Sequence, residues 1–329
     1  MFHEKKTSIY IFERVKLTAL LFFCKLERMN EMIILRLIQA LLVLAMLFIF
    51  LLLVRHIRKN KINPFKRFWT GFWIGLVTDA LDTLGIGSFA TTTTCFKLTK
   101  LVTDDRKLPG TMTVGHVLPV LIQSLCFIFV VKVEVLTLVT MAAAAFIGAY
   151  FGTKITKNWH TPTVQRILGG LLILAALIMI FRMIFHPGDN LSDAVHGLHG
   201  IWLFVGIAFN FTVGVLMTMG LGNYAPELIF FSLMGLSPTV AMPVMMLDAA
   251  MIMTASSSQF IKADRVSWDG FAGIVLGGII GVLLAVFFLT NLDLNSLKLL
   301  VVLIVIFTGG MLIRSSLNPS IANKQKQTH

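Results

Sequence analysis

Long apolar runs, separated by short polar stretches, make up most of the chain. Seven of these runs are each near the roughly 20 residues that a helix needs to cross the hydrocarbon of a bilayer. They cover residues 32–54, 112–131, 135–153, 164–185, 240–261, 268–290 and 297–313. Two further hydrophobic segments, 68–98 and 199–236, are too long for one straight helix. The pattern predicts an all-α integral membrane protein with seven simple crossings and two broken or re-entrant helices.

The two long segments carry nearly the same motif. Residues 83–90 read TLGIGSFA, and residues 218–225, which lie 135 positions later, read TMGLGNYA. Glycine pairs of this kind break a helix and expose backbone polar groups that lipid does not tolerate, so we expect those groups to line a site buried in protein. Two matched breaks therefore predict a transporter core that is built from two repeats.

The distribution of Lys and Arg predicts the topology, because cytoplasmic loops collect these residues. If each broken segment returns to the side from which it enters, the basic loops share one side and the acidic loops share the other. The inside loops are then 55–67, 97–107, 154–157, 262–265 and the C-terminal tail, and the outside loops contain Asp189, Asp193 and Asp293. Each half then holds one hairpin and three crossings. Because three is odd, the second half enters the membrane inverted relative to the first.

This interpretation divides the chain into five parts. Residues 1–31 are expected to be an extension that forms an interfacial helix or precedes a later start at Met29 or Met32. Residues 32–67 supply an additional transmembrane helix and a basic loop. The two repeats follow at 68–185 and 199–315, and residues 316–329 form a short cytoplasmic tail.

Composition supports the same class of protein. Hydrophobic residues make up 57% of the chain and charged residues 13%, whereas soluble domains carry about 25% charge. The net charge of +12 comes from residues lying between the apolar runs, so we expect membrane lipids as partners and no nucleic acid. Cys24, Cys95 and Cys126 form no C-x-x-C pair, so neither a disulfide framework nor a metal site is predicted. No cofactor is expected.

The helix breaks are the candidate substrate site. After each break the chain restarts a short helix, whose first N–H groups have no partner within the helix and which carries the positive end of the helix dipole. Such ends bind negatively charged oxygen atoms. The candidate substrate-binding residues are Gly85, Gly87, Ser88, Thr91, Gly220, Gly222 and Asn223. In the alternative interpretation, the glycines only allow close packing of helices, and the threonines at 91–94 bond to carbonyls one turn back.

Ionisable residues within the apolar segments are the second set of candidates. Asp79 and Asp82 share one helical face, Glu227 follows the second break, and Asp248 lies in the middle of a later run. A charged side chain costs about 2.5–3.5 kcal/mol at a helix centre, so each acid needs a partner, water or a proton. We interpret these four acids as proton-coupling candidates, with His116 as a fifth. Alternatively, the acids lie near an interface and the histidine is only hydrogen-bonded.

The arrangement resembles the sulfite exporter TauE/SafE family of membrane permeases, whose halves each begin with a glycine-rich break, commonly G-x-G-G-G with a later proline. The matching positions are Gly85 and Gly87, then Gly220 and Gly222 with Pro226. This chain departs from that pattern by having Ser88 and Asn223 in place of glycines and Thr91 in place of the first proline. The resemblance covers about residues 68–315. It implies a multi-pass plasma-membrane permease for small organic or inorganic sulfur-containing anions, such as sulfite or sulfonates, without an ATPase.

A passive channel and a membrane enzyme are the alternative classes of protein. A passive anion channel could use the same helix-end donors, although it would not need buried acids. An integral membrane enzyme is not expected, because the chain lacks H-E-x-x-H, G-x-S-x-G and the phosphate-binding G-x-x-x-x-G-K. The expected partner is a small anionic substrate, and the sequence leaves open which anion is moved, in which direction and with which coupling ion. It also leaves open whether the protein is a monomer or a homodimer.

Overall fold

The computed structural model describes residues 32–128, 133–158, 160–185, 195–288 and parts of 306–317. Within these residues all regular structure is helical, as predicted. After the N-terminal helix Met32–Lys59, the elements are α2 (Phe68–Thr83), α3 (Phe89–Thr99), η1 (Asp105–Lys107), α4 (Leu108–Phe127), α5 (Val135–Thr156), α6 (Thr161–Phe185), α7 (Ile201–Met217), α8 (Tyr224–Leu233), α9 (Pro238–Lys262) and α10 (Phe271–Phe288). The extension 1–31, the tail beyond 317 and most of the crossing at 297–313 lie outside the described residues.

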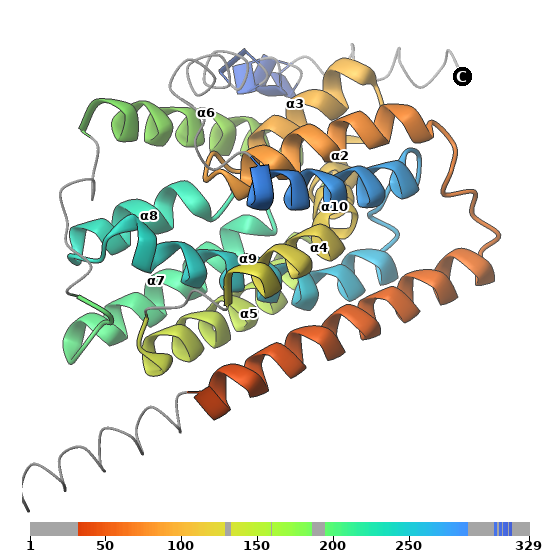
Figure 1. The fold of residues 1–329 in the computed structure, drawn as a ribbon. Helices are drawn as coiled ribbons and strands as arrows, with labels where there is room; N and C mark the ends of the chain where they lie inside the picture. The colour runs from red at the N-terminus through yellow and green to blue at the C-terminus, as the bar shows by residue number, and fades with distance from the viewer. Residues whose placement is uncertain are drawn as a thin grey trace, which may run out of the picture. The chain divides into compact units, whose positions relative to one another are not determined.

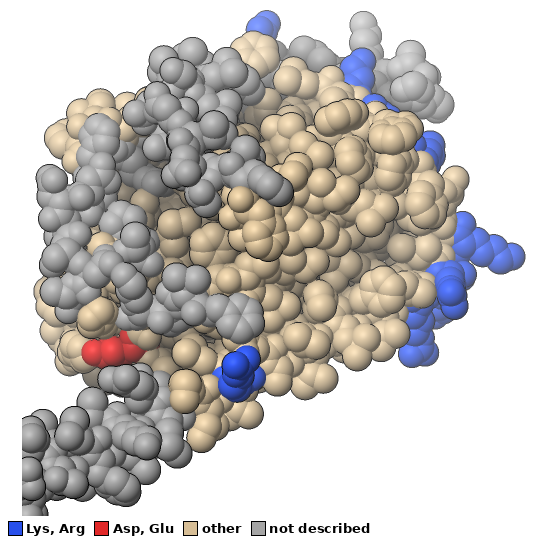
Figure 2. Space-filling view, in the orientation of Figure 1, with Lys and Arg blue, Asp and Glu red and all other residues tan. Residues whose placement is uncertain are grey.

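Five described helices are long and apolar enough to span a membrane. They are Met32–Lys59, Asp105–Phe127, Val135–Thr156, Pro162–Phe185 and Val240–Lys262. In Figure 2 residues other than Lys, Arg, Asp and Glu cover most of the described part of the face shown. Many large hydrophobic side chains are exposed, among them Leu136, Phe204 and Phe287. A soluble protein would not expose so large an apolar surface. The chain is therefore a membrane protein. The predicted crossings at 32–54, 135–153, 164–185 and 240–261 are confirmed as helices, and so are residues 112–127 of the crossing predicted at 112–131.

Residues 1–43 and 44–329 form two separate compact units. The helix Met32–Lys59 extends from the first unit into the second, and most of its residues are exposed. Leu37, Leu44 and Phe48 are each more than half exposed. Ile49 and Leu53 are buried. The rest of this apolar helix, which is largely exposed, is suited to contact with lipid.

Within the second unit, helices of the two predicted repeats pack against each other. Helix α10 lies along α2 and also contacts α4, while α5 lies along α7 and also contacts α9 (Figure 1). Helices α4 and α9 contact each other directly. Each repeat thus supplies one helix that covers the broken helix of the other, so the two halves form one interlocked core.

Glycines make two of these pairings very close. A Cβ atom on Gly281 of α10 would overlap the backbone carbonyl of Leu76 in α2. In the same way, a Cβ atom on Gly148 of α5 would overlap the carbonyl of Phe211 in α7. Small residues let helix backbones approach in this manner where packing rather than water drives association. The same backbone contact is thus built twice, once for each broken helix.

Candidate functional site

Both long hydrophobic segments break where the sequence predicts, and both break in the same way. Helix α2 ends at Thr83 and α7 at Met217, and glycines with positive φ follow, Gly85 at +82° and Gly220 at +110°. Two backbone hydrogen bonds of the Schellman type close each end. At the end of α2, the amides of Gly85 and Ile86 donate to the carbonyls of Asp82 and Leu81 at 2.9 and 3.0 Å. At the end of α7, the amides of Gly220 and Leu221 donate to the carbonyls of Met217 and Leu216 at 3.1 and 3.2 Å. Only glycine adopts this conformation at no steric cost.

Each broken segment forms a hairpin. The guanidinium of Arg67, just before α2, donates to the carbonyls of Thr99 and Lys100 at 2.7 and 2.8 Å, so α2 begins where α3 ends. In the second segment, a Cβ atom on Gly235, just after α8, would lie 3.8 Å from Val195, just before α7. Both segments therefore return to the end of the helix bundle from which they started, as the charge pattern predicts.

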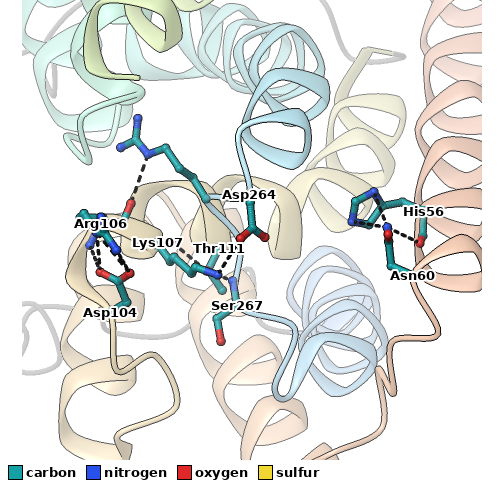
Figure 3. Close-up of polar contacts among 9 residues, drawn as sticks. His56, Asn60, Asp104, Arg106, Lys107, Thr111, Asp264 and Ser267 are labelled. Atoms are coloured by element: carbon teal, nitrogen blue, oxygen red, sulfur yellow. Dashed lines mark hydrogen bonds and ion pairs between the residues drawn. The ribbon is translucent and has the colours of Figure 1, made fainter. Parts of the chain in front are cut away.

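The first hairpin opens at the end of the bundle that carries the basic loops, which we call the basic end. There Lys66 pairs with Asp269 at 3.0 Å. Lys107 pairs with Asp264 at 3.6 Å (Figure 3). Four loops predicted to share one side, 55–67, 97–107, 154–157 and 262–265, are joined at this end by these contacts and those of Arg265. The second hairpin opens at the other end, where the amide of Glu134 donates to the carbonyl of His196 at 2.8 Å.

Arg265 is the most buried cation of the basic end, 8% exposed. It donates to the carbonyl of Thr156, the last residue of α5, at 2.8 Å and to the carbonyl of Arg106 at 3.3 Å. Burial, together with the neighbouring positive charge of Arg106, lowers the pKa of Arg265 to about 10. The side chain still carries its charge at neutral pH. Its hydrogen bonds join the α9–α10 loop to the loops at 97–107 and 154–157.

The tips of the two hairpins meet. A Cβ atom on Gly87 would lie 4.0 Å from the Cβ of Tyr224, and one on Gly222 would lie 3.5 Å from the Cβ of Phe89. These contacts are reciprocal, because Gly87 and Gly222 are equivalent in the two motifs, and so are Phe89 and Tyr224. The glycine of each break faces the first helical residue after the other break, so both short helices begin at one place inside the protein.

The two tips differ in what their first amide contacts. The amide of Ser88 donates to Oδ1 of Asp82 at 2.7 Å, so a carboxylate of the chain itself binds the start of α3. The equivalent of Asp82 in the second half is Met217, which offers no acceptor. Among the described residues, the amide of Asn223 has no acceptor. The second tip therefore keeps the helix-end donors that were expected at both.

Three of the four threonines after the first break bond to their own helix. Thr91 donates to the carbonyl of Ser88 at 2.8 Å, and Thr93 and Thr94 donate to carbonyls four residues back at 2.8 and 3.0 Å. These three hydroxyls bond to carbonyls about one turn back, as in the alternative interpretation. The hydroxyl proton of Thr91, a candidate substrate-binding residue, is therefore already used in a hydrogen bond. Two of the four also reach α4: the hydroxyl of Thr93 lies 2.8 Å from Sδ of Met112, and Thr92 turns its hydroxyl toward His116.

In the first half, Thr92 is the end of a buried triad. Nδ1 of His116 in α4 lies 2.8 Å from Oδ2 of Asp79 in α2, and its Nε2 lies 3.3 Å from Oγ1 of Thr92 in α3. All three residues have no exposed surface. The triad joins both arms of the first hairpin to α4 and pairs one acid with one imidazole, so Asp79 is buried inside the protein with a partner.

The second half contains a comparable triad of Asn210, Asp248 and Glu227. Nδ2 of Asn210 in α7 donates to Oδ2 of Asp248 in α9 at 2.8 Å. The carboxyl group of Glu227 in α8 interacts electrostatically with that of Asp248. Nδ2 of Asn223 donates to Oε2 of Glu227 at 2.9 Å and to the carbonyl of Met245 at 2.8 Å. This triad has no exposed surface and pairs two acids with amide groups only.

The repeat itself relates the two triads. Thr92 and Glu227 are separated by the same 135 residues as the glycine motifs, and His116 and Asp248 by 132. Asn210 contacts Asp248 as Asp79 contacts His116. The position equivalent to Asp79 is Gly214, one helical turn after Asn210. The ionisable members of both triads were predicted from the sequence, but Asn210 was not. A polar amide within the apolar run of α7 was the signal that could have revealed it.

Tyr224 connects the two halves. Its hydroxyl accepts from Nε2 of Gln123 in α4 at 2.9 Å and lies near the carboxyl groups of Asp82 and Glu227. Tyr224 is 3% exposed and Gln123 is fully buried. Neither residue was predicted, because an aromatic residue and a glutamine in apolar segments carry no signal until their helices are placed side by side.

The site is buried, polar and rich in acids. Around the meeting tips lie four carboxyl groups and one imidazole, and none of these groups forms an ion pair with Lys or Arg in the described part of the chain. Each of the four carboxyl groups keeps one buried oxygen without a hydrogen-bond partner. The described residues contain no group of three His, Cys, Asp or Glu side chains that could hold a metal ion.

The fold and the site define a class: an all-helical membrane protein in which two glycine-broken helices meet at buried ionisable residues. No protein-family model, curated protein or solved structure matches this chain. The resemblance to the TauE/SafE permeases thus rests on the glycine motifs alone.

Proposed function

We propose that the protein is a secondary transporter that moves small anions by alternating access, with sulfur-containing anions such as sulfite and sulfonates as its substrates. The observation that carries this proposal is the meeting of the two breaks, Gly87 against Tyr224 and Gly222 against Phe89. Paired broken helices that meet inside a bundle supply unpaired backbone groups to a solute, which is how many carriers bind their substrates. Packing alone does not need a second, matched break.

The two repeats are proposed to be inverted. The hairpins open at opposite ends of the helix bundle, the first beside Arg67 and Thr99 and the second beside Val195 and Gly235. Equivalent residues then approach one site from opposite sides, which supports exposure of that site to each side in turn. The positive-inside rule favours the basic loops on the cytoplasmic side. A plasma-membrane location is part of the proposal and follows from the resemblance to the TauE/SafE permeases.

The second tip is the proposed substrate position. At the first tip the amide of Ser88 donates to the carboxylate of Asp82. This contact is a precedent within the chain for the binding of a carboxylate oxygen at such a helix end. At the second tip the amides of Asn223 and Tyr224 remain for the oxygen atoms of a substrate. Gly222 allows a ligand to approach this backbone closely.

An anion that enters among four carboxyl groups needs positive charge with it. We propose that protons supply part of this charge and that the Asp79–His116 pair takes part in their transfer. A histidine beside a carboxylate exchanges protons near neutral pH. The hydroxyl of Tyr224 lies near the carboxyl groups of Asp82 in the first half and Glu227 in the second.

Flux through the purified protein in liposomes tests the proposal. We expect saturable uptake of radiolabelled sulfite or a small sulfonate, accelerated by a pH gradient, and competition from other sulfur oxyanions. Chloride at the same concentration is the control anion. Unitary currents in planar bilayers without saturation would instead identify an anion channel, and no flux of any anion would refute transport.

A further inference from the structure

The second-half triad has more acceptors than donors. Oδ1 of Asp248, Oε1 of Glu227 and Oδ1 of Asn210 are all buried and have no hydrogen-bond partner. Each belongs to a side chain with no exposed surface. Buried oxygen atoms without partners are rare in native proteins and call for an explanation such as an ion or ordered water.

Contacts within the triad hold these oxygens in one neighbourhood. The amide of Asn210 is bonded to the carboxyl group of Asp248, so its oxygen lies beside that group. The amide of Asn223 bonds at once to Glu227 and to the carbonyl of Met245, which lies one turn before Asp248 on α9. Side chains of three helices, α7, α8 and α9, therefore meet in this region, and Glu227 also interacts electrostatically with Asp248.

The first-half triad shows that this excess is particular to the second half. There the carboxyl group of Asp79 faces the imidazole of His116, which provides a positive charge when it is protonated. At the position equivalent to His116 the second half has Asp248, and at that of Thr92 it has Glu227. The second triad thus replaces a base and a hydroxyl with two acids and adds no cation of its own.

We propose that the second-half triad of Asn210, Glu227 and Asp248 binds a sodium ion. Carboxylate and amide oxygens are the ligands that hard cations prefer, and the set contains no sulfur or imidazole nitrogen that would favour a transition metal. A single proton can join only two of the three oxygen atoms, whereas one sodium ion contacts all three. In carriers built on broken helices, the coupling-ion site and the substrate site lie together at the interface of the repeats.

The sodium ion would also serve the proposed transport. It brings positive charge to within one helix turn of the second tip, where the anion is proposed to bind, because Glu227 lies in the first turn of α8. Its role as a coupling ion rests on the proposed function. Its binding does not, and can be measured without any substrate.

Thermal unfolding of the full-length protein in detergent, followed by tryptophan fluorescence, tests sodium binding. At constant pH and ionic strength, NaCl is compared with KCl and choline chloride, with no sulfur anion present. A hundredfold excess of sodium over its dissociation constant is expected to raise the unfolding midpoint by roughly 5 °C. Equal midpoints in all three salts overturn the proposal. A midpoint that responds to pH and not to sodium assigns a proton to the triad and overturns it as well.

Variants locate the site. Asp248→Asn and Glu227→Gln keep the shape of the side chains, remove one charge each, and are expected to abolish the sodium-dependent shift. Thr92→Val, at the position equivalent to Glu227, is the matched control and is expected to retain it. An undiminished shift in both acid variants places the ion elsewhere and refutes the assignment. Binding of ²²Na⁺ to the wild-type protein provides a direct readout if either variant fails to fold.

This outcome is separable from that of the proposed function. Sodium-dependent stabilisation without flux of any anion would leave the cation site standing and remove the transporter. Saturable anion flux without sodium binding would do the reverse.

Discussion

Replacement of Gly222 by leucine should stop transport with little loss of folding. Gly222 does not have a positive φ, and a Cβ atom there would make an ordinary contact of 3.5 Å with Phe89. Alanine should therefore fit without backbone strain. Leucine adds three more carbon atoms at the point where the two tips meet, and overpacking of this kind costs typically about 1–3 kcal/mol. Those atoms would occupy the space in front of the amides that are proposed to bind substrate.

Gly85→Ala provides the matched control. Gly85 has φ of +82° and no atom within 4 Å of an added Cβ, so alanine there causes strain without filling the site. The left-handed conformation costs roughly 1–2 kcal/mol for a residue other than glycine, and the lower entropy of the unfolded chain returns about 0.4–1 kcal/mol. We thus expect a net loss of about 1 kcal/mol.

Flux in liposomes and the midpoint of thermal unfolding, measured on the same preparations, separate the two effects. Gly85→Ala should lower the midpoint and retain flux. Gly222→Ala should retain both, and Gly222→Leu should lose at least tenfold in flux while still unfolding cooperatively. Wild-type flux in Gly222→Leu would show that the meeting of the tips is not the transport site.

Three further predictions concern packing and the buried polar contacts. Gly281→Ala should lower the free energy of unfolding by about 2 kcal/mol or more, because its methyl group would overlap the backbone of α2, whereas Gly170→Ala, with nothing within 4 Å, should raise it by up to about 1 kcal/mol in the same unfolding assay. Arg265→Ala should lose roughly 2–4 kcal/mol by chemical denaturation, since it removes charge-assisted hydrogen bonds to two carbonyls. Tyr224→Phe, which leaves Nε2 of Gln123 without its partner, should cost about 1–2 kcal/mol and change the apparent affinity for the anion in flux assays.

The acid-rich site changes how the chemistry of the tips is understood. Helix ends alone would favour any small anion, but four carboxyl groups surround them here. Under the proposed function, charge balance makes cations partners in anion binding, with a protonated imidazole proposed for one half and a sodium ion for the other. The two halves share a backbone plan and differ in the side chains that provide this balance.

The amino-acid sequence by itself determined the class of fold and the positions of the breaks. Apolar runs of about 20 residues can be satisfied only by helices in a bilayer, so the crossings follow from local composition. The glycines at 85 and 220 also act locally, because the conformation they permit ends a helix whatever surrounds it. The candidates Asp79, Asp82, Glu227, Asp248 and His116 likewise follow from the sequence, since an ionisable group in an apolar segment is costly wherever that segment packs.

Only the tertiary structure decided which of these residues meet. The exchange of α5 and α10 between the halves, the contact of Gly87 with Tyr224, and the pairing of Asn210 with Asp248 all join residues that are far apart in the chain. Such contacts depend on how whole helices pack, which the period of a single helix does not encode. In the sequence Tyr224 looks like an ordinary core residue. Its hydroxyl comes near both Asp82 and Glu227 only because two hairpins from opposite ends bring their tips together.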